Sequence, residues 1–196
     1  MPVVGIIPVR SFHLGKQRLA TTLEPARREE LGRALTGHVA GIVDEVGLVP
    51  LIVTADPHVA HWAVTAGFGT VPDPGEGLDA ACAAGVTWAG LSGSAWLVIH
   101  SDLPLLQPTD LEVVVSAVDS GREVIAPSSD GGTSVLSARA PIEFAYGSAS
   151  FHRHLTRLTE PMVVIRPGLL QDIDSPQDLT AARSHPAGAW LPTLMP

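Results

Sequence analysis

Short, continuously apolar segments alternate along this chain with longer segments of helical character. The first apolar run covers Val3 to Val9, and the strongest of the later ones covers Trp96 to His100. Uninterrupted apolar runs of this length are typical of strands that are buried on both faces. Such strands, alternating with helices, predict an α/β fold with a doubly wound, mostly parallel sheet and right-handed crossovers.

The remaining elements are expected to continue this alternation without an internal repeat or a dividing linker. Further strands are expected near residues 50–54, 68–71, 123–126, 134–138 and 162–166. Helices are expected over 25–46, 78–91, 109–118 and 150–158, and from about 56 and 175 onwards. A chain of 196 residues suits one domain with a full core. We therefore expect a single domain over residues 1–185 and a loose, proline-rich tail over 186–196.

Composition excludes several classes of protein. Hydrophobic residues make up 45% of the chain and charged residues 16%, which is typical of a folded domain. A net charge of −8 argues against a nucleic-acid partner. The sequence has no apolar run long enough to span a bilayer, and its first residues do not resemble a secretory signal. The single cysteine, Cys82, fits a reducing compartment, so we expect a cytoplasmic protein without a membrane partner.

Basic residues gather in the loop that follows the first expected strand. The loop carries Arg10, Lys16 and Arg18 together with Ser11 and Gly15. It leaves the carboxyl end of the strand, where doubly wound sheets bind their ligands. Arginine forks and lysine ammonium groups both pair with phosphate oxygens, so the loop is a candidate triphosphate site. The alternative is an ordinary solvated loop, because the glycine spacings of a P-loop and of a dinucleotide-binding turn are both absent.

Three aspartates are candidate metal ligands. Asp102 ends the strongest apolar strand, where a carboxylate commonly holds Mg²⁺ on a nucleotide. Asp172 and Asp174 lie two residues apart, so in an extended segment their carboxylates converge while Ile173 faces the core. Converging carboxylates repel unless a cation lies between them, and oxygen ligands suit Mg²⁺. The alternatives are a turn cap for Asp102 and a helix N-cap for Asp174.

Two glycine-rich segments are less specific. Residues 131–134 and 147–150 could present N–H groups and hydroxyls to a small anion, or could simply be tight turns. The eight histidines show no metal-binding spacing, which favours surface or packing roles. Nucleophilic hydrolysis has no support, because there is no Gly-x-Ser-x-Gly elbow and Cys82 lies within an expected helix.

Taken together, these motifs resemble the 2-phospho-L-lactate or phosphoenolpyruvate guanylyltransferase family of coenzyme F-420 biosynthesis. The resemblance extends from Val3 to about Leu179, with six motifs in order. They are Pro8-Val9-Arg10 with Lys16-Gln17-Arg18-Leu19, Gly77-Leu78-Asp79, Ser101 to Leu106, Asp130-Gly131-Gly132-Thr133, Gly147 to Phe151, and Asp172 to Leu179.

The resemblance implies a single domain of the nucleotide-diphospho-sugar-transferase-like (Rossmann-like) variant of the sheet. The implied reaction transfers GMP from GTP to a phosphorylated three-carbon acid and releases pyrophosphate. The acceptor is phosphoenolpyruvate or 2-phospho-L-lactate, with 3-phospho-D-glycerate as a further option. The product is a labile anhydride, so hand-over to a downstream transferase is expected.

Specific residues inherit roles from the resemblance. The implied Mg²⁺ ligands are Asp102, Asp172 and Asp174. The implied contacts to the phospho-acid are Thr133, Gly147 and Ser150. The implied nucleotide-binding residues are Arg10, Lys16, Arg18, Gly77 and Asp79. The implied catalytic residues are Lys16, Arg18 and Asp102, with the two cations stabilising the charge that gathers on pyrophosphate.

The chain departs from the family at three positions. The family usually has lysine at the position of Arg10 and asparagine at those of Asp79 and Ser134. Asp79 matters most, because an acid there could alter base preference or read the N–H groups of guanine. Two alternatives therefore stay open: another nucleotidyltransferase of the same fold, with a sugar-phosphate or molybdopterin-type acceptor, and a non-catalytic GTP-binding partner subunit.

Overall fold

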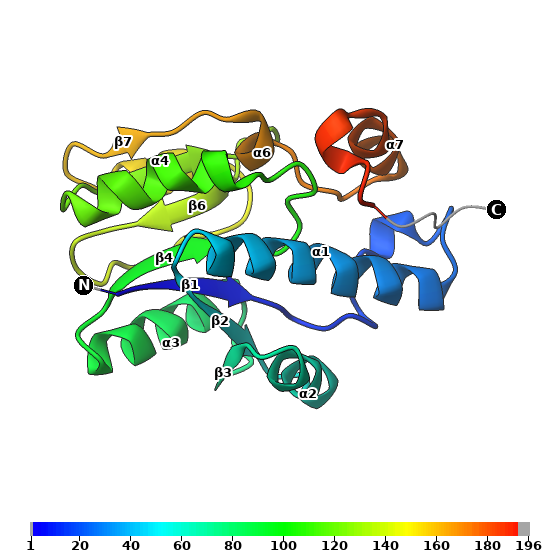
Figure 1. Ribbon diagram of the computed structural model, residues 1–196, viewed down its shortest axis with the longest axis horizontal. Coiled ribbons are helices and arrows are strands. Elements are labelled where there is room, and N and C mark those ends of the chain that lie inside the picture. Colours follow the sequence, from blue (N-terminus) through cyan, green and yellow to red (C-terminus); the bar gives the residue numbers. More distant parts are fainter. Residues whose placement is uncertain (1, 192–196) are drawn as a thin grey trace.

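The computed structural model describes residues 2–191. Its sheet has seven strands in the order β3-β2-β1-β4-β6-β5-β7 (Figure 1). The strands are β1 (Val3–Pro8), β2 (Val49–Thr54), β3 (Gly69–Pro72), β4 (Ala95–Ile99), β5 (Val124–Pro127), β6 (Thr133–Ser137) and β7 (Met162–Val163). The helices are α1 (Pro25–Glu45), α2 (Pro57–Thr65), α3 (Leu78–Leu91), α4 (Pro108–Asp119), α5 (Ser150–Leu155), α6 (Pro167–Leu170) and α7 (Pro176–Ser184), with 3₁₀ turns at Gln17–Leu19 and Pro186–Gly188.

All strand pairs are parallel except those of β6, which runs antiparallel to both β4 and β5. The prediction of a doubly wound, mostly parallel sheet is therefore confirmed. The reversal of β6 has a local cause, because only residues 128–132 separate it from β5. A connection this short can join antiparallel neighbours but cannot make a parallel crossover.

Helices cover both faces of the sheet, as the buried strands require. Along β1, Val3 and Ile7 pack with α1, α2 and α4, whereas Val4 and Ile6 pack with α3 on the opposite face. This alternation explains why the first strand is apolar at every position. The expected ends of the first helix also hold, since α1 begins at a proline and stops just before Gly47, whose φ of +80° suits a glycine terminator. The helix expected over 150–158 ends earlier, at Leu155.

A third apolar cluster lies at the carboxyl edge of the sheet. It joins Leu19 of the basic loop, Leu35 of α1, Leu105 after β4, and Ile173 before α7, all nearly or fully buried. These residues come from distant parts of the chain, and their packing fixes the loops that carry the candidate site.

The first part of the proline-rich tail packs against this edge. The Trp190 ring stacks on His38 with centroids 4.1 Å apart, and its Nε1 donates to the carbonyl of Pro104 at 2.9 Å. Leu191 is only 7% exposed. The prediction of a loose extension from residue 186 is therefore wrong for the part up to Leu191. The indole and leucine side chains of this part bury apolar area against the domain. Residues 192–196 lie outside the described range.

The strand expected over residues 162–166 also needs correction. The segment after residue 162 gives a two-residue strand and then α6, because Pro167 starts a helical turn. The guanidinium of Arg28 in α1 is not solvated, since the residue is 8% exposed and its Nη1 donates to the carbonyl of Leu23 at 2.9 Å.

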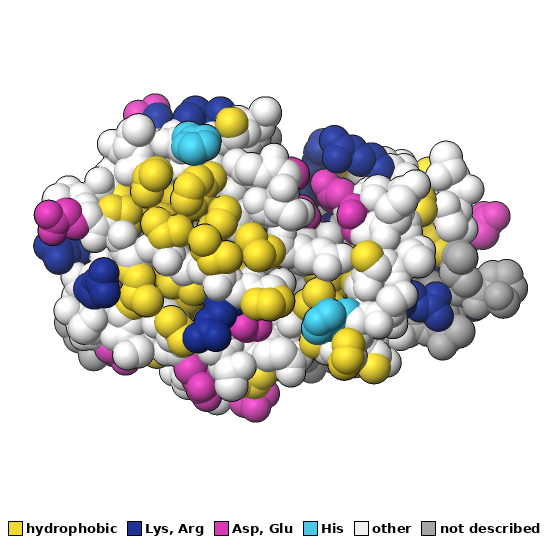
Figure 2. Space-filling view, turned by 90° about the horizontal axis from the view of Figure 1, so that it is seen from above, with side chains coloured by type: hydrophobic (Ala, Val, Ile, Leu, Met, Phe, Trp, Pro, Cys, Tyr) yellow, Lys and Arg dark blue, Asp and Glu magenta, His cyan; other side chains and the backbone are white. Residues whose placement is uncertain are grey.

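Hydrophobic side chains gather over α4 and β7 in the view of Figure 2. In β7 and the segment that follows it, Val163 and Ile165 are 43% and 66% exposed. Val113 and Met162 line a shallow hollow beside them. Among residues 2–191, no helix is both long and apolar enough to cross a membrane.

Candidate active site

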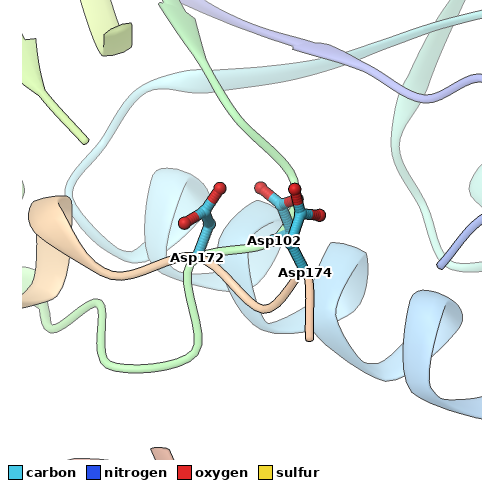
Figure 3. A group of neighbouring side chains, drawn as sticks. All are labelled: Asp102, Asp172 and Asp174. Atoms are coloured by element: carbon cyan, nitrogen blue, oxygen red, sulfur yellow. The ribbon is translucent and has the colours of Figure 1, made fainter. Parts of the chain in front are cut away.

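Three aspartates converge at the carboxyl edge of the sheet. Asp102 follows β4, while Asp172 and Asp174 lie on the extended segment between α6 and α7 (Figure 3). One carboxylate oxygen from each lies within 4.8 Å of the others. Ile173 between them is fully buried, and its N–H donates to the carbonyl of Asp102 at 3.2 Å. The apolar anchor and this hydrogen bond hold the two segments together, so the geometry expected from the i, i+2 spacing is present.

Asp174 is not the N-cap of the last helix. That position belongs to Ser175, which forms a capping box with Asp178 at the start of α7. The Asp174 carboxylate is therefore available to the other two acids and to the basic loop. This removes the alternative explanation for its place in the sequence.

The basic loop brings its cations to these acids. Lys16 Nζ lies 2.6 Å from Asp102 Oδ2 and 3.6 Å from Asp174 Oδ1, and Arg18 Nη1 lies 3.3 Å from Asp174 Oδ2. The loop is shaped for this by Phe12, which is 5% exposed in the core, and by a left-handed backbone at Lys16. Because Phe12 and Leu19 are buried, the polar residues between them are directed to the edge of the sheet.

The charges of the cluster shift its pKa values in different directions. Burial lowers the pKa of Lys16, but attraction to Asp102 and Asp174 outweighs it, so the net pKa is raised. Burial raises the pKa of Asp102, whereas Lys16 and His100 lower it, and the net pKa falls. Burial and then repulsion from Asp102 and Asp174 raise the pKa of Asp172 to about 6. Asp172 is thus the acid that most lacks a positive partner.

Next to the acids lies a cavity of about 580 Å³, here called the acceptor cavity. Its walls include the three aspartates and Arg18, and also the three residues that the resemblance assigns to the phospho-acid. Those residues are Thr133, Gly147 and Ser150. The structure thus places the expected metal ligands and the expected acceptor contacts around one space. Their roles remain predictions.

Thr133 is held by a buried hydrogen-bond relay. The N–H of Ala145 donates to His154 Nε2 at 2.9 Å, so the proton of the neutral ring lies on Nδ1. Nδ1 lies 2.9 Å from Thr133 Oγ1, and Ser150 Oγ donates to the same oxygen at 3.3 Å. With both lone pairs of Thr133 engaged, its hydroxyl proton is left for a group in the cavity. Burial and nearby arginines lower the pKa of His154 to about 4, which keeps the ring neutral.

Asp130 fixes the turn that delivers Thr133. Its Oδ1 accepts from Ser128 Oγ at 2.5 Å and from the N–H of Gly132 at 2.9 Å. The hydrogen bond from Ser128 contributes most to lowering the pKa of Asp130, and the bond from Gly132 follows it. Both bonds keep the carboxylate ionised. The segment that the sequence left open between an anion site and a turn is therefore a turn, and Thr133 opens the strand behind it.

A second cavity of about 710 Å³, here called the nucleotide cavity, adjoins the first. Arg10, Ser11, Asp56 and Gly77 are among its lining residues, and Pro8 lines both cavities. Ser11 Oγ donates to Asp56 Oδ2 at 2.6 Å, which joins the loops after β1 and β2. The nucleotide residues expected from the sequence are thus divided among three places.

Arg10 and Gly77 line the nucleotide cavity, whereas Lys16 and Arg18 lie at the acids. The carboxylate of Asp79 accepts a hydrogen bond from the N–H of Tyr146 at 2.7 Å, on the acceptor side. The structure therefore does not bring Asp79 together with Arg10.

The sequence analysis assigned the histidines to surface or packing roles and therefore missed His154. It also missed the neighbouring Arg153. A signal was available for His154, since it lies four residues after Ser150 and therefore on the same face of α5. His100 was also missed. It lines the acceptor cavity, and its ring centroid lies 5.2 Å from that of Tyr146.

The fold is shared with solved nucleotidyltransferases. A Desulfovibrio desulfuricans protein described as a candidate nucleotide-diphospho-sugar transferase matches with a TM-score of 0.74 and 13% identity, covering 96% of this chain and 94% of that one. A nucleotidyl transferase from Methanothermobacter matches with a TM-score of 0.61 and 17% identity, covering 94% and 97%. At these identities the likeness concerns the fold alone.

Curated relatives are more similar in sequence. The phosphoenolpyruvate guanylyltransferase of Rubrobacter xylanophilus is 33% identical over 189 residues, which cover 91% of this chain and 92% of that protein. The 2-phospho-L-lactate guanylyltransferase of Methanothermobacter thermautotrophicus is 30% identical over 166 residues, covering 82% and 73%.

The fold and these relatives define an enzyme of the nucleotidyltransferase class. Residues 3–183 match the family model described as "Guanylyl transferase CofC like", and the chain belongs to this guanylyltransferase family.

Proposed function

We propose that the enzyme transfers GMP from GTP to the phosphate of a small phosphorylated three-carbon acid and releases pyrophosphate. The acceptor is phosphoenolpyruvate or 2-phospho-L-lactate, the two substrates in the names of its relatives, with 3-phospho-D-glycerate as a further candidate. The observation that carries this proposal is the gathering of Asp102, Asp172 and Asp174 with Thr133 and Ser150 around one cavity.

The acid trio fits Mg²⁺. Its ligand atoms are all carboxylate oxygens within 4.8 Å of one another, the donor type that Mg²⁺ prefers. Within residues 2–191, Asp102 Oδ1 is buried and has no hydrogen-bond partner, and such an orphan acceptor is costly without a cation. Mg²⁺ held by Asp102, Asp172 and Asp174 would neutralise the phosphate oxygens of donor and acceptor and orient them toward each other.

The proposed reaction is a displacement at the α-phosphorus of GTP. An oxygen of the acceptor phosphate, already ionised at neutral pH, forms the new bond to the α-phosphorus of GTP. The bond from that phosphorus to the bridging oxygen of the β-phosphate breaks, and pyrophosphate leaves with that electron pair. No general base is needed, so the task of the protein is alignment and charge stabilisation.

Named groups supply that alignment. The Thr133 hydroxyl, directed into the cavity by His154, and Ser150 would hold oxygens of the acceptor. Lys16, kept cationic by its acidic neighbours, and Arg18 would stabilise negative charge on the departing pyrophosphate. Arg10 and Gly77 would contact the nucleotide.

From the motifs that resemble the guanylyltransferase family of coenzyme F-420 biosynthesis, we further infer that the enzyme acts in that pathway. The product joins two phosphates in a labile anhydride, which a downstream transferase would consume. A cytoplasmic location belongs to the same proposal.

The test is pyrophosphate release with GTP, Mg²⁺ and each of the three phospho-acids, with mass analysis of the guanylyl product. Release that depends on one acid would support the reaction and identify the acceptor. Absence of release with all three acids, while GTP still binds, would contradict the proposal and favour a different acceptor or a GTP-binding subunit.

The Asp172→Asn variant and a matched control variant distinguish a catalyst from a GTP-binding subunit. Asp172→Asn should retain the fold and GTP binding yet lose turnover. Asp44→Asn removes an equivalent charge from an exposed position on α1 and should leave turnover unchanged.

A further inference from the structure

The loop over residues 145–148 forms one wall of the acceptor cavity. Tyr146, Gly147 and Ser148 all line that cavity, and Gly147 has a φ of +102°, which favours glycine. The loop precedes α5 and contributes its backbone rather than long side chains to the phospho-acid side. Its position therefore depends on whatever holds that backbone.

Helix α5 holds the loop from one side. The guanidinium of Arg153 donates to the carbonyls of Ala145 at 2.8 and 3.0 Å, of Tyr146 at 3.0 Å, and of Ser148. His154 accepts from the N–H of Ala145 on the same side. These contacts are local, since all partners lie within nine residues of one another.

Helix α3 holds the loop from the other side, across 67 residues of sequence. Asp79 Oδ1 accepts from the N–H of Tyr146 at 2.7 Å. Cys82 lies one turn further along α3, on the same face as Asp79, and burial and then this thiol raise the pKa of the Tyr146 phenol. The Tyr146 ring packs on the apolar cluster that contains Cys82. The backbone and the ring of Tyr146 are thus both docked on α3.

We propose that Asp79 is a positioning residue for the acceptor loop, rather than a reader of the guanine base. This inference rests on the proposed function and assigns Asp79 to the phospho-acid half of the site. The oxygen of Asp79 that faces the loop is already engaged by a backbone N–H. Leu78, the residue before it, lines both cavities, so the first turn of α3 joins the nucleotide side to the acceptor side.

The proposal makes a distinction between charge and hydrogen bonding. An asparagine at position 79 keeps a carbonyl oxygen where Oδ1 lies and can accept from Tyr146, although it carries no charge. An alanine removes both the charge and the acceptor. A positioning role therefore predicts that Asp79→Asn retains function and that Asp79→Ala does not, whereas reading of guanine predicts that both change the response to nucleotide.

The experiment measures steady-state pyrophosphate release for both variants, with GTP and the phospho-acid varied separately. Asp79→Ala should raise KM for the phospho-acid about tenfold, the usual effect of losing one well-placed hydrogen bond, and should change KM for GTP less than about twofold. Asp79→Asn should stay within about twofold of the wild type in both. Glu76→Ala, which removes a nearby exposed acid, is the matched control and should behave as the wild type.

Amide hydrogen exchange of the peptide that contains Tyr146 provides a readout independent of turnover. Exchange should accelerate in Asp79→Ala and remain at the wild-type rate in Asp79→Asn and Glu76→Ala. The proposal is overturned if Asp79→Ala raises KM for GTP alone, if Asp79→Asn relaxes the preference for GTP over ATP, or if exchange at Tyr146 is unchanged. Absence of turnover in the wild type would instead contradict the proposed function, and the exchange rates would still decide whether Asp79 holds the loop.

Discussion

The two neighbouring cavities of this enzyme are built in different ways. The nucleotide cavity is formed by loops after the consecutive parallel strands β1, β2 and β3, with few ionic contacts between its walls. The acceptor cavity is lined mainly by segments near residues 100–102, 128–133, 146–150 and 172–174, to which Pro8, Arg18 and Leu78 are added. It contains a dense network of aspartates, cations and buried hydroxyls.

The difference has a physical consequence. An acidic cavity repels the phosphorylated acid that it is proposed to bind, unless cations compensate. The nucleotide cavity faces no such conflict, because the base and ribose that it is proposed to bind are neutral. We therefore expect changes in the acceptor cavity to act on turnover and acceptor affinity, and to leave nucleotide binding largely intact.

The strongest way to break this comparison is to remove a central acid. Asp102→Asn should lower kcat by about 10²–10³-fold, because it removes one of three converging carboxylates and the partner of Lys16. Binding of GTP, measured by calorimetry without the acceptor, should weaken far less. Equal losses of GTP affinity and turnover would show that the two cavities do not act separately.

A smaller effect is expected from the hydroxyl that faces the acceptor. Thr133→Val keeps the shape of the side chain but removes its donor, and should raise KM for the phospho-acid about tenfold at unchanged KM for GTP. Thr133→Ser should restore most of the affinity. A rise in KM for GTP in the valine variant would place Thr133 on the nucleotide side.

His154 tests whether the relay behind that hydroxyl matters. His154→Phe should raise KM for the phospho-acid about threefold to tenfold, because Thr133 loses the N–H that orients it.

The folded-state pKa of His154, about 4, lies below its unfolded value of 6.5, so its contribution to stability is present above pH 6.5 and declines as pH falls toward 4. In thermal melts between pH 6.5 and pH 4, the His154→Phe variant should therefore lose less stability with falling pH than the wild type does.

The smallest expected effect is one on stability, and it concerns Asp172, the acid that most lacks a positive partner. The folded-state pKa of Asp172 is raised to about 6 from 3.8, so the unfavourable burial of its charge develops as pH rises through this window. Without metal at pH 7.5, Asp172→Asn should be more stable than the wild type by about 1 kcal/mol, after allowance for solvent screening. Denaturant unfolding measures this, and added Mg²⁺ should stabilise the wild type more than the variant. Equal stabilisation of both proteins would argue against Asp172 as a ligand.

Much of the fold followed from local chemistry. Continuous apolar runs identified the buried strands, and prolines or capping residues at positions 25, 57 and 175 identified helix starts. The convergence of Asp172 and Asp174 also followed from sequence, because side chains two residues apart on an extended segment share a side. These features depend on neighbours within a few residues, which the sequence displays directly.

Tertiary structure decided the features that depend on long-range contacts. Lys16 meets Asp102 across 86 residues, and the backbone N–H of Tyr146 meets Asp79 across 67. No local pattern indicates which of several polar side chains will be paired in this way. The sequence by itself determined which strands and acids form the carboxyl edge, while packing of the distant loops decided which cation, hydroxyl and carboxylate share each cavity, because those contacts form only after the strands are aligned in one sheet.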